Sequence, residues 1–91
     1  MRKSVLITGS SMGIGAASAV AFAKEGYDVG INYFTSAGEA DRVAEQCRAA
    51  GADAQIYQAD VSERGQCEAM LNSFIAHFGK IDVLVNNAGG A

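Results

Sequence analysis

The sequence predicts an α/β fold in which a doubly wound parallel β-sheet carries helices on its faces. Two observations lead to this prediction. Along the 91 residues, short apolar runs alternate with longer helix-forming runs in the order β-α-β-α-β-α-β. Each connection between strands is also long enough to hold a helix, so successive strands are expected to run parallel. With right-handed crossovers, the natural spatial order of these strands is 3-2-1-4.

The first expected strand and helix stand at the N-terminus. Ser4–Ile7 is an apolar run with two β-branched residues, as in a strand buried on both faces. Residues 16–25 are strong helix formers without proline, and Gly26 is suited to end that helix. A second strand is predicted at residues 29–33.

The middle of the chain repeats this pattern. Thr35 or Ser36 is expected to cap the second helix, which ends near Gly51. Ala54–Gln58 reads as a third, weaker strand. The apolar stripe expected on the second helix consists of Ala40, Val43, Ala44 and Cys47.

The clearest amphipathic helix of the sequence follows the third strand. Ser62 is a good N-cap for it, and Gly79 is expected to stop it after Phe78. A fourth strand is predicted at residues 81–86. The apolar positions of the helix keep the spacing i, i+3, i+4, i+7 and are Cys67, Met70, Leu71, Phe74, Ile75 and Phe78.

Composition and charge restrict the class of protein. Hydrophobic residues make up 49% of the chain, as in a globular domain, and the net charge is −3. An acidic balance argues against nucleic acid or an anionic membrane as a partner. No apolar run approaches the roughly 20 residues that span a bilayer, and the N-terminus is too short for a signal-peptide core. The sequence therefore predicts a cytoplasmic protein.

The cysteines and the histidine are expected to be structural. Cys47 and Cys67 fall on the apolar sides of two helices, where buried, inert thiols are the favoured interpretation. There is no CxxC motif and no His/Cys cluster, so no metal site is predicted. His77 lies in the last turn of a helix, where it favours the negative end of the helix dipole.

A glycine-rich stretch joins the first strand to the first helix. Glycines in such a turn let a ligand approach the backbone closely, and the helix start offers unpaired N–H groups to a phosphate. A ligand with a pyrophosphate group is therefore expected here. The alternative is a small-residue loop that only closes a βα unit. The stretch runs Thr8, Gly9, Ser10, Ser11, Met12, Gly13, Ile14, Gly15.

The end of the fourth strand carries a second distinctive stretch, Asn86-Asn87-Ala88-Gly89. In the order 3-2-1-4, the carboxyl ends of strands 1 and 4 flank the point where the strand order reverses. Ligands of open α/β sheets bind in that crevice. The two special stretches are thus predicted to meet at one site of a Rossmann-like fold.

These motifs resemble a known family when they are taken together. TGxxxGIG at residues 8–15, Asp60-Val61 and Asn86-Asn87-Ala88-Gly89 are similar to the N-terminal half of the short-chain dehydrogenases/reductases. The resemblance covers essentially the whole chain. It is closest to 3-oxoacyl-carrier-protein reductases and to sugar or alcohol dehydrogenases, which use a nicotinamide dinucleotide on a carbonyl or alcohol substrate.

The resemblance implies a role for each motif. Backbone groups of residues 9–15 would hold the ribose and pyrophosphate of the cofactor. The Asp60 carboxylate would accept from the adenine amino group beside the Val61 backbone, and the residues Asn87, Ala88 and Gly89 would line the adenine ribose. Two structural alternatives stand beside these roles. Asp60 would be favourable ahead of any helix N-terminus, and the asparagine pair could serve only as a turn.

The end of the second strand bears on the choice of cofactor. Tyr33, Phe34 and Thr35 stand there, whereas an NAD-preferring member would place an acid to bond the ribose 2′-OH. We therefore expect NADP rather than NAD. The basic residue that NADP users often carry at Met12 or Phe34 is missing, so the hydroxyls of Thr35 and Ser36 are the candidates to hold a 2′-phosphate.

Catalytic residues are absent from the sequence. The family relies on a Tyr-x-x-x-Lys pattern with a serine, but Tyr27, Tyr33 and Tyr57 all lack the lysine four residues later. The 91 residues are therefore expected to represent a cofactor-binding half that needs a further, catalytic part. A stand-alone dinucleotide-binding or structural module is the alternative. Because strand 4 would be an apolar edge, we also expect self-association, as in a homo-oligomer.

Overall fold

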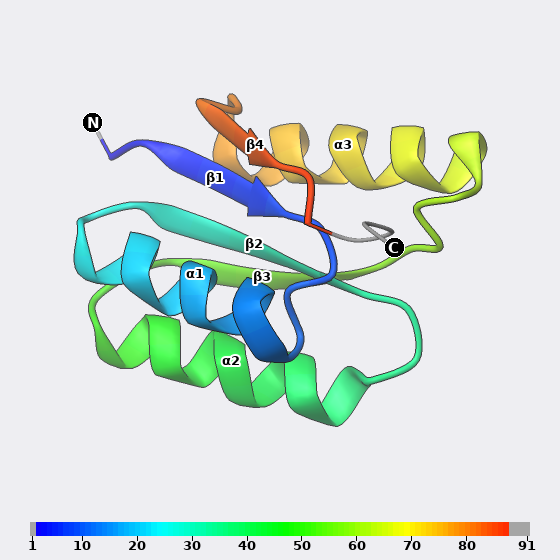
Figure 1. Cartoon of the computed structure of the whole chain (residues 1–91). Coiled ribbons are helices and arrows are strands. Elements are labelled where there is room, and N and C mark those ends of the chain that lie inside the picture. Colours follow the sequence, from blue (N-terminus) through cyan, green and yellow to red (C-terminus); the bar gives the residue numbers. More distant parts are fainter. Residues whose placement is uncertain (1, 88–91) are drawn as a thin grey trace.

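The computed structural model describes residues 2–87, which form a parallel four-stranded sheet with the strand order β3-β2-β1-β4. The predicted fold class and strand order are thus confirmed. Helices α1 and α2 cover one face of the sheet, and α3 covers the other (Figure 1). The elements in chain order are β1 (Ser4–Ile7), α1 (Gly13–Lys24), β2 (Asp28–Tyr33), α2 (Ala37–Ala49), β3 (Ala54–Gln58), α3 (Arg64–Phe78) and β4 (Val83–Val85).

The strand register brings the carboxyl ends of three strands together. Ile7 at the end of β1 pairs with Ile31 of β2 on one side and with Val85 of β4 on the other. The loops that follow β1, β2 and β4 therefore leave the sheet at the same edge. The first and last loops of the described chain are neighbours there.

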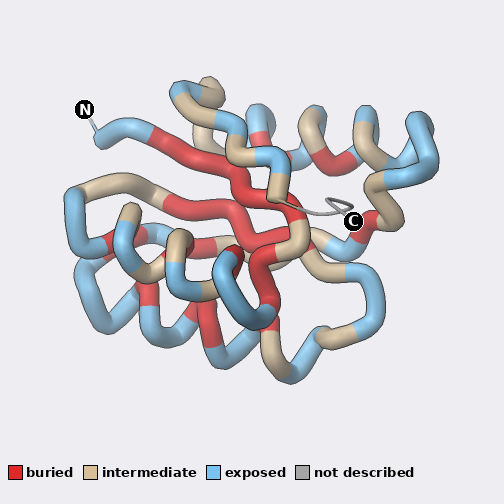
Figure 2. Tube along the Cα trace, in the orientation of Figure 1, coloured by how far each residue is buried: buried red, intermediate tan, exposed pale blue. Residues whose placement is uncertain are grey.

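The two faces of the sheet are covered unequally. Beneath α1 and α2, small alanines let these helices approach the strands, which are largely buried (Figure 2). The face beneath α3 has a smaller core of Leu6, Ala59, Met70 and Phe74. On the same face, Leu84 of β4 is 54% exposed. The larger core consists of Val5, Ile7, Ala19, Ala23, Val29, Ile31, Ala40, Val43, Ala44, Cys47, Ala52 and Ala54.

Helix α3 reaches the sheet because β2 has no side chain at Gly30. A Cβ at that position would lie 2.6 Å from Cε2 of Phe74 and 3.0 Å from Cδ1 of Leu6. The ring of Phe74 is fully buried and makes an aromatic contact with Phe78, at 4.6 Å between ring centroids. In the same last turn of α3, Nε2 of His77 lies 2.8 Å from Oδ2 of Asp53.

The start of α1 and the length of β4 differ from the sequence prediction. Helix α1 begins at Gly13, three residues earlier than expected, because helical hydrogen bonding extends into the glycine turn. Ser36, one of the two predicted caps, does occupy the N-cap of α2, although its side chain makes no capping hydrogen bond. Strand β4 contains three residues rather than six, and these three pair with Val5, Leu6 and Ile7 of β1.

The start of α3 was predicted wrongly. Glu63, not Ser62, is the N-cap. The Ser62 hydroxyl instead donates to Oδ1 of Asp60 at 2.6 Å, and the Ser62 N–H donates to the same oxygen at 3.0 Å. Ser62 therefore stabilises a short turn with Asp60, although its helix-capping propensity predicted that it would start α3.

The burial predictions for α3 and the cysteines hold only in part. Cys47 is fully buried, and burial raises the pKa of its thiol to about 11. Cys67 is only half-buried, and Ile75 is 42% exposed although it lies on the predicted apolar stripe. The helix therefore presents a narrower buried face than its sequence pattern indicated. Within residues 2–87, none of the helices has the length and apolarity to cross a membrane, and no cluster of three metal-ligating side chains occurs.

Candidate functional site

The glycine loop between β1 and α1 ends in a helix start suited to an anion. Gly9 and Gly13 adopt φ angles of 60° and 62°, which other residues rarely tolerate. The first N–H groups of a helix have no intrahelical acceptor, and here they belong to Gly13, Ile14 and Gly15, since Ala16 N already donates to Met12 O. No acidic residue lies in the first turn of α1 to oppose an anion.

The backbone of the loop is packed closely around Gly15. A Cβ there would lie 2.4 Å from the carbonyl oxygen of Gly9 and 2.8 Å from both Ser10 Cα and Asn87 Nδ2. No side chain fits this space without a shift of the backbone. The helix start, the glycine loop and the loop after β4 therefore meet at Gly15.

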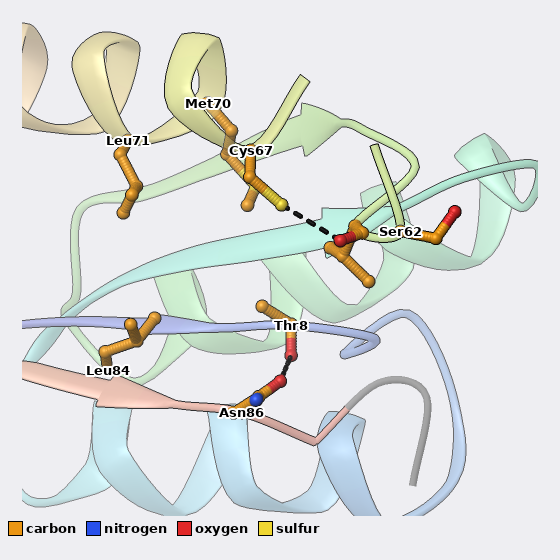
Figure 3. A pocket seen from close by; sticks show the side chains of 8 residues that line it. Thr8, Ser62, Cys67, Met70, Leu71, Leu84 and Asn86 are labelled. Carbon is orange, nitrogen blue, oxygen red and sulfur yellow. Dashed lines mark hydrogen bonds between the residues drawn. The ribbon is translucent and has the colours of Figure 1, made fainter. Parts of the chain in front are cut away.

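Hydrogen bonds tie the loop after β4 to the glycine loop. The Asn87 N–H donates to Oγ1 of Thr8 at 2.9 Å, and Asn87 Nδ2 donates to the carbonyl of Gly9 at 3.1 Å. Oγ1 of Thr8 also lies 3.2 Å from Oδ1 of Asn86 (Figure 3). The structure thus brings together two motifs that are almost 80 residues apart. The predicted site residues Ala88 and Gly89 lie outside the described residues.

Asp60 lies beyond β3 at the same edge of the sheet, where Ala59 N donates to the Tyr33 carbonyl at 2.9 Å. Its Oδ1 accepts from the hydroxyl and the N–H of Ser62, and its own N–H donates to Oε1 of Gln66 at 2.7 Å. The hydrogen bond from the Ser62 hydroxyl is the main cause that lowers the pKa of Asp60 below its usual value. Both of these bonds to the carboxylate involve Oδ1.

A mostly apolar groove of about 470 Å³ lies between α3 and the strands β1 and β4 (Figure 3). It begins beside Thr8, so it opens next to the two joined loops. One of its walls is the Cys67 side chain, whose Sγ lies 3.1 Å from the Val61 carbonyl. The lining residues are Thr8, Val61, Ser62, Cys67, Met70, Leu71, Leu84 and Asn86.

Large apolar side chains stand exposed around the glycine loop. Met12 is 56% exposed, Ile14 is 79% exposed, and Phe34 after β2 is 54% exposed. Thr35 is exposed as well, whereas Tyr33 is half-buried and packs on the larger core. Ser10 and Ser11, by contrast, are buried.

Asn32 is a site residue that sequence reasoning missed. It is 2% exposed in β2, and its Oδ1 accepts from the N–H of Gly9 at 2.9 Å. The signal in the sequence was a lone asparagine within an apolar strand. Its partners could not be read without the strand register.

Comparisons with known proteins agree with this geometry. The family model for short chain dehydrogenase matches residues 3–91. The 3-oxoacyl-[acyl-carrier-protein] reductase FabG of Staphylococcus aureus is 45% identical over 98% of this chain and 36% of its own length.

Solved structures give the same result. A short-chain dehydrogenase/reductase from Serratia marcescens superposes with a TM-score of 0.92 at 37% identity, over 96% of this chain and 36% of its own. A Burkholderia cenocepacia protein whose crystal structure contains NADP gives a TM-score of 0.89 at 35% identity, over 93% of this chain and 33% of its own. The chain therefore spans about a third of the length of these proteins. Because the family model covers nearly every residue, the chain belongs to the short-chain dehydrogenases.

Proposed function

We propose that this chain is the dinucleotide-binding part of an NAD(P)-dependent oxidoreductase, which transfers hydride between a nicotinamide and a carbonyl or alcohol substrate. The observation that supports this most directly is the meeting of the glycine loop, the start of α1 and Asn87 around Gly15. The activities named for similar proteins, an acyl-carrier-protein reductase and an acetoin dehydrogenase, are of this class.

The residues present fit a dinucleotide. The helix start offers the N–H groups of Gly13, Ile14 and Gly15 to the pyrophosphate. Because Gly15 has no side chain, the Gly9–Ser10 backbone can lie directly against the helix start. Oδ2 of Asp60 is available to accept from the adenine amino group beside the Val61 backbone. Asn87, with Ala88 and Gly89, would line the adenine ribose.

NADP is the cofactor we propose, ahead of NAD. The residues after β2 are Tyr33, Phe34 and Thr35, none of which carries a negative charge to repel a 2′-phosphate. The exposed Thr35 hydroxyl, with Ser36 at the start of α2, would hold that phosphate. NADP in the similar Burkholderia cenocepacia protein supports the same choice.

Hydride transfer needs a proton donor or acceptor beside the substrate oxygen. No tyrosine in the sequence has a lysine four residues later, so we propose that the acid–base groups and the substrate pocket are supplied by residues outside this 91-residue sequence. We further propose that the active protein is a homo-oligomer. The exposed apolar edge at β4 supports this proposal.

The test is a fluorescence titration of the full-length protein with NADPH and NADH. We expect NADPH to bind more tightly, and Gly15→Ala to weaken binding at least tenfold. Gly38→Ala is the matched control, because a Cβ at that helical glycine would meet nothing within 4 Å. Tighter binding of NADH would overturn the NADP assignment, and equal affinities of the two variants would overturn the site.

The alternative function is dinucleotide binding without catalysis. A reductase assay with carbonyl substrates and NADPH separates the two functions. Binding without turnover in the full-length protein would favour the alternative, and turnover would exclude it.

A further inference from the structure

Asn32 and Ser10 form a buried hydrogen-bonded pair beneath the glycine loop. Ser10 is fully buried and Asn32 is 2% exposed. The Asn32 N–H donates to Oγ of Ser10 at 3.0 Å, and the Asn32 carbonyl accepts from the Ser10 N–H at 3.0 Å. Oγ of Ser10 in turn donates to the Ile7 carbonyl at 2.6 Å. Ser10 thus continues the pairing of β1 with β2 beyond the last residue of β1.

The side-chain amide of Asn32 connects three segments. Oδ1 accepts from the N–H of Gly9 at 2.9 Å. Nδ2 faces the carbonyls of Tyr57 and Ala59, at 3.3 and 3.2 Å, where β3 ends. Buried polar groups are costly unless they are bonded, and here both halves of the amide have partners of the correct polarity. Among the natural side chains, asparagine supplies an acceptor and a donor at this length.

This arrangement decides which N–H groups of the loop remain for a ligand. The N–H groups of Gly9 and Ser10 are both directed at Asn32. These two groups are therefore not free to meet a phosphate, whereas the N–H groups of the helix start, at Gly13, Ile14 and Gly15, remain directed away from Asn32. The Ser10–Asn32 pair therefore fixes the path of the loop on the protein side, while the opposite side stays open.

We propose that Asn32 is a positioning residue for the dinucleotide, which acts by holding the Gly9–Ser10 backbone in its binding geometry before the ligand arrives. The inference rests on the proposed function and deepens it. A loop that is already ordered loses less conformational freedom on binding, so affinity depends on the pair even though Asn32 does not face the ligand side of the loop. Asn32 contacts the loop backbone and has no part in the chemical step.

The experiment uses the full-length protein with Asn32→Asp and Ser10→Ala. The Asn32→Asp variant keeps an acceptor for the Gly9 N–H but loses the Nδ2 donors, whereas Ser10→Ala removes a single hydroxyl and is the milder change. The matched controls are Asn72→Asp and Ser73→Ala, both exposed on α3. Three readouts are compared: Kd for NADPH, the split between KM and kcat at saturating substrate, and hydrogen exchange of the backbone amides of residues 9–13.

We expect Asn32→Asp to raise Kd and KM for NADPH at least tenfold and Ser10→Ala to raise them severalfold, with kcat within twofold of the wild type. Exchange at residues 9–13 should accelerate more than exchange in α2. Wild-type affinity and exchange in a folded Asn32→Asp or Ser10→Ala protein would overturn the proposal. If Asn32→Asp fails to fold, Ser10→Ala alone decides.

Failure of the proposed function gives a different result. In that case the wild-type protein binds neither dinucleotide, while the exchange experiment still reports whether Asn32 orders the loop. Faster loop exchange in the variants would then support the ordering role, and unchanged exchange would exclude it.

Discussion

The ring of Phe74 in α3 occupies the space that a side chain at Gly30 of β2 would fill, with 2.6 Å between Cε2 of the ring and the position of such a Cβ. Phe74 is the largest fully buried side chain in residues 2–87. The contact is central to the smaller core, which holds α3 on its face of the sheet.

Gly30→Ala should therefore destabilise the fold by about 1–3 kcal/mol, because the added methyl group must displace the ring or the strand. Urea denaturation measures the change. Gly65→Ala in α3 is the control, since a Cβ there would meet nothing within 4 Å and alanine favours helix. If Gly30→Ala unfolds at the same urea concentration as the wild type, the ring is free to move aside and the close packing of α3 is refuted.

The Asp82 carboxylate links the start of β4 to the start of β1, at the amino ends of these strands and therefore away from the candidate site. Its Oδ2 accepts from Nζ of Lys80 at 2.9 Å and from the N–H of Ser4 at 2.8 Å. The hydrogen bond from Lys80, followed by that from Ser4, lowers the pKa of Asp82 below its usual value. The fold thus favours the ionised carboxylate.

The sign of the resulting pH dependence follows from this lowered pKa. The stabilisation from Asp82 is complete above the pKa of an unfolded aspartate, about 4, and is lost as the pH falls through the lower folded value. Asp82→Asn should remove part of the loss of stability between roughly pH 4 and pH 2. Urea midpoints across this range test it, with Asp41→Asn, exposed on α2, as control. If the urea midpoint falls as steeply with decreasing pH in Asp82→Asn as in the wild type, the expectation is contradicted.

Asp60 has both a structural and a proposed binding role, and one pair of variants separates them. Asp60→Ala in the full-length protein should raise Kd for NADPH roughly tenfold or more, as expected for a lost charge-assisted hydrogen bond. Ser62→Ala removes the hydroxyl partner of Asp60 but keeps the carboxylate, so it should leave Kd unchanged. Calorimetric titration and Tm are measured on both. Equal losses of Tm with normal Kd in both variants would leave Asp60 as a helix-start residue only.

The edge strand β4 predicts the solution behaviour of the isolated 1–91 polypeptide. Leu84 is 54% exposed on the thinly covered face, and β4 pairs with β1 alone among the described strands. We expect this polypeptide to self-associate in sedimentation experiments and to show no reductase activity. Leu84→Lys should reduce association, whereas Phe34→Lys, at an equally exposed position, should not. A monodisperse monomer with cooperative melting would refute the edge argument.

The sequence was sufficient for the architecture because apolar alternation and connection length determine the strand order. It was also sufficient to place Gly15 and Asn87 at one crevice, since that conclusion needs only the topology. The roles of residues such as Asp60 and Val61 stay predictions.

What the sequence did not reveal depends on contacts between distant residues. Asn32 looked like one polar residue in a strand, and only the register of β2 against the end of β1 shows that it meets Gly9 and Ser10. The N-cap of α3 was predicted wrongly at Ser62, because a serine before a helix can either cap the helix or bond a neighbouring aspartate. Local propensity does not distinguish these two roles. The exposed Ile75 was unpredictable because spacing alone does not say how wide the buried face of α3 is.

The bonds from Asn87 to Thr8 and Gly9 span 79 and 78 residues of sequence. A nascent chain emerges from the ribosome N-terminus first, so the glycine loop is synthesised long before the asparagine that completes its surroundings. Contacts of such separation also form late, because closing a long loop costs more entropy than closing a short one. β1 and α1 are therefore made before β4, and this edge of the sheet is complete for a ligand only after Asn87 has been synthesised.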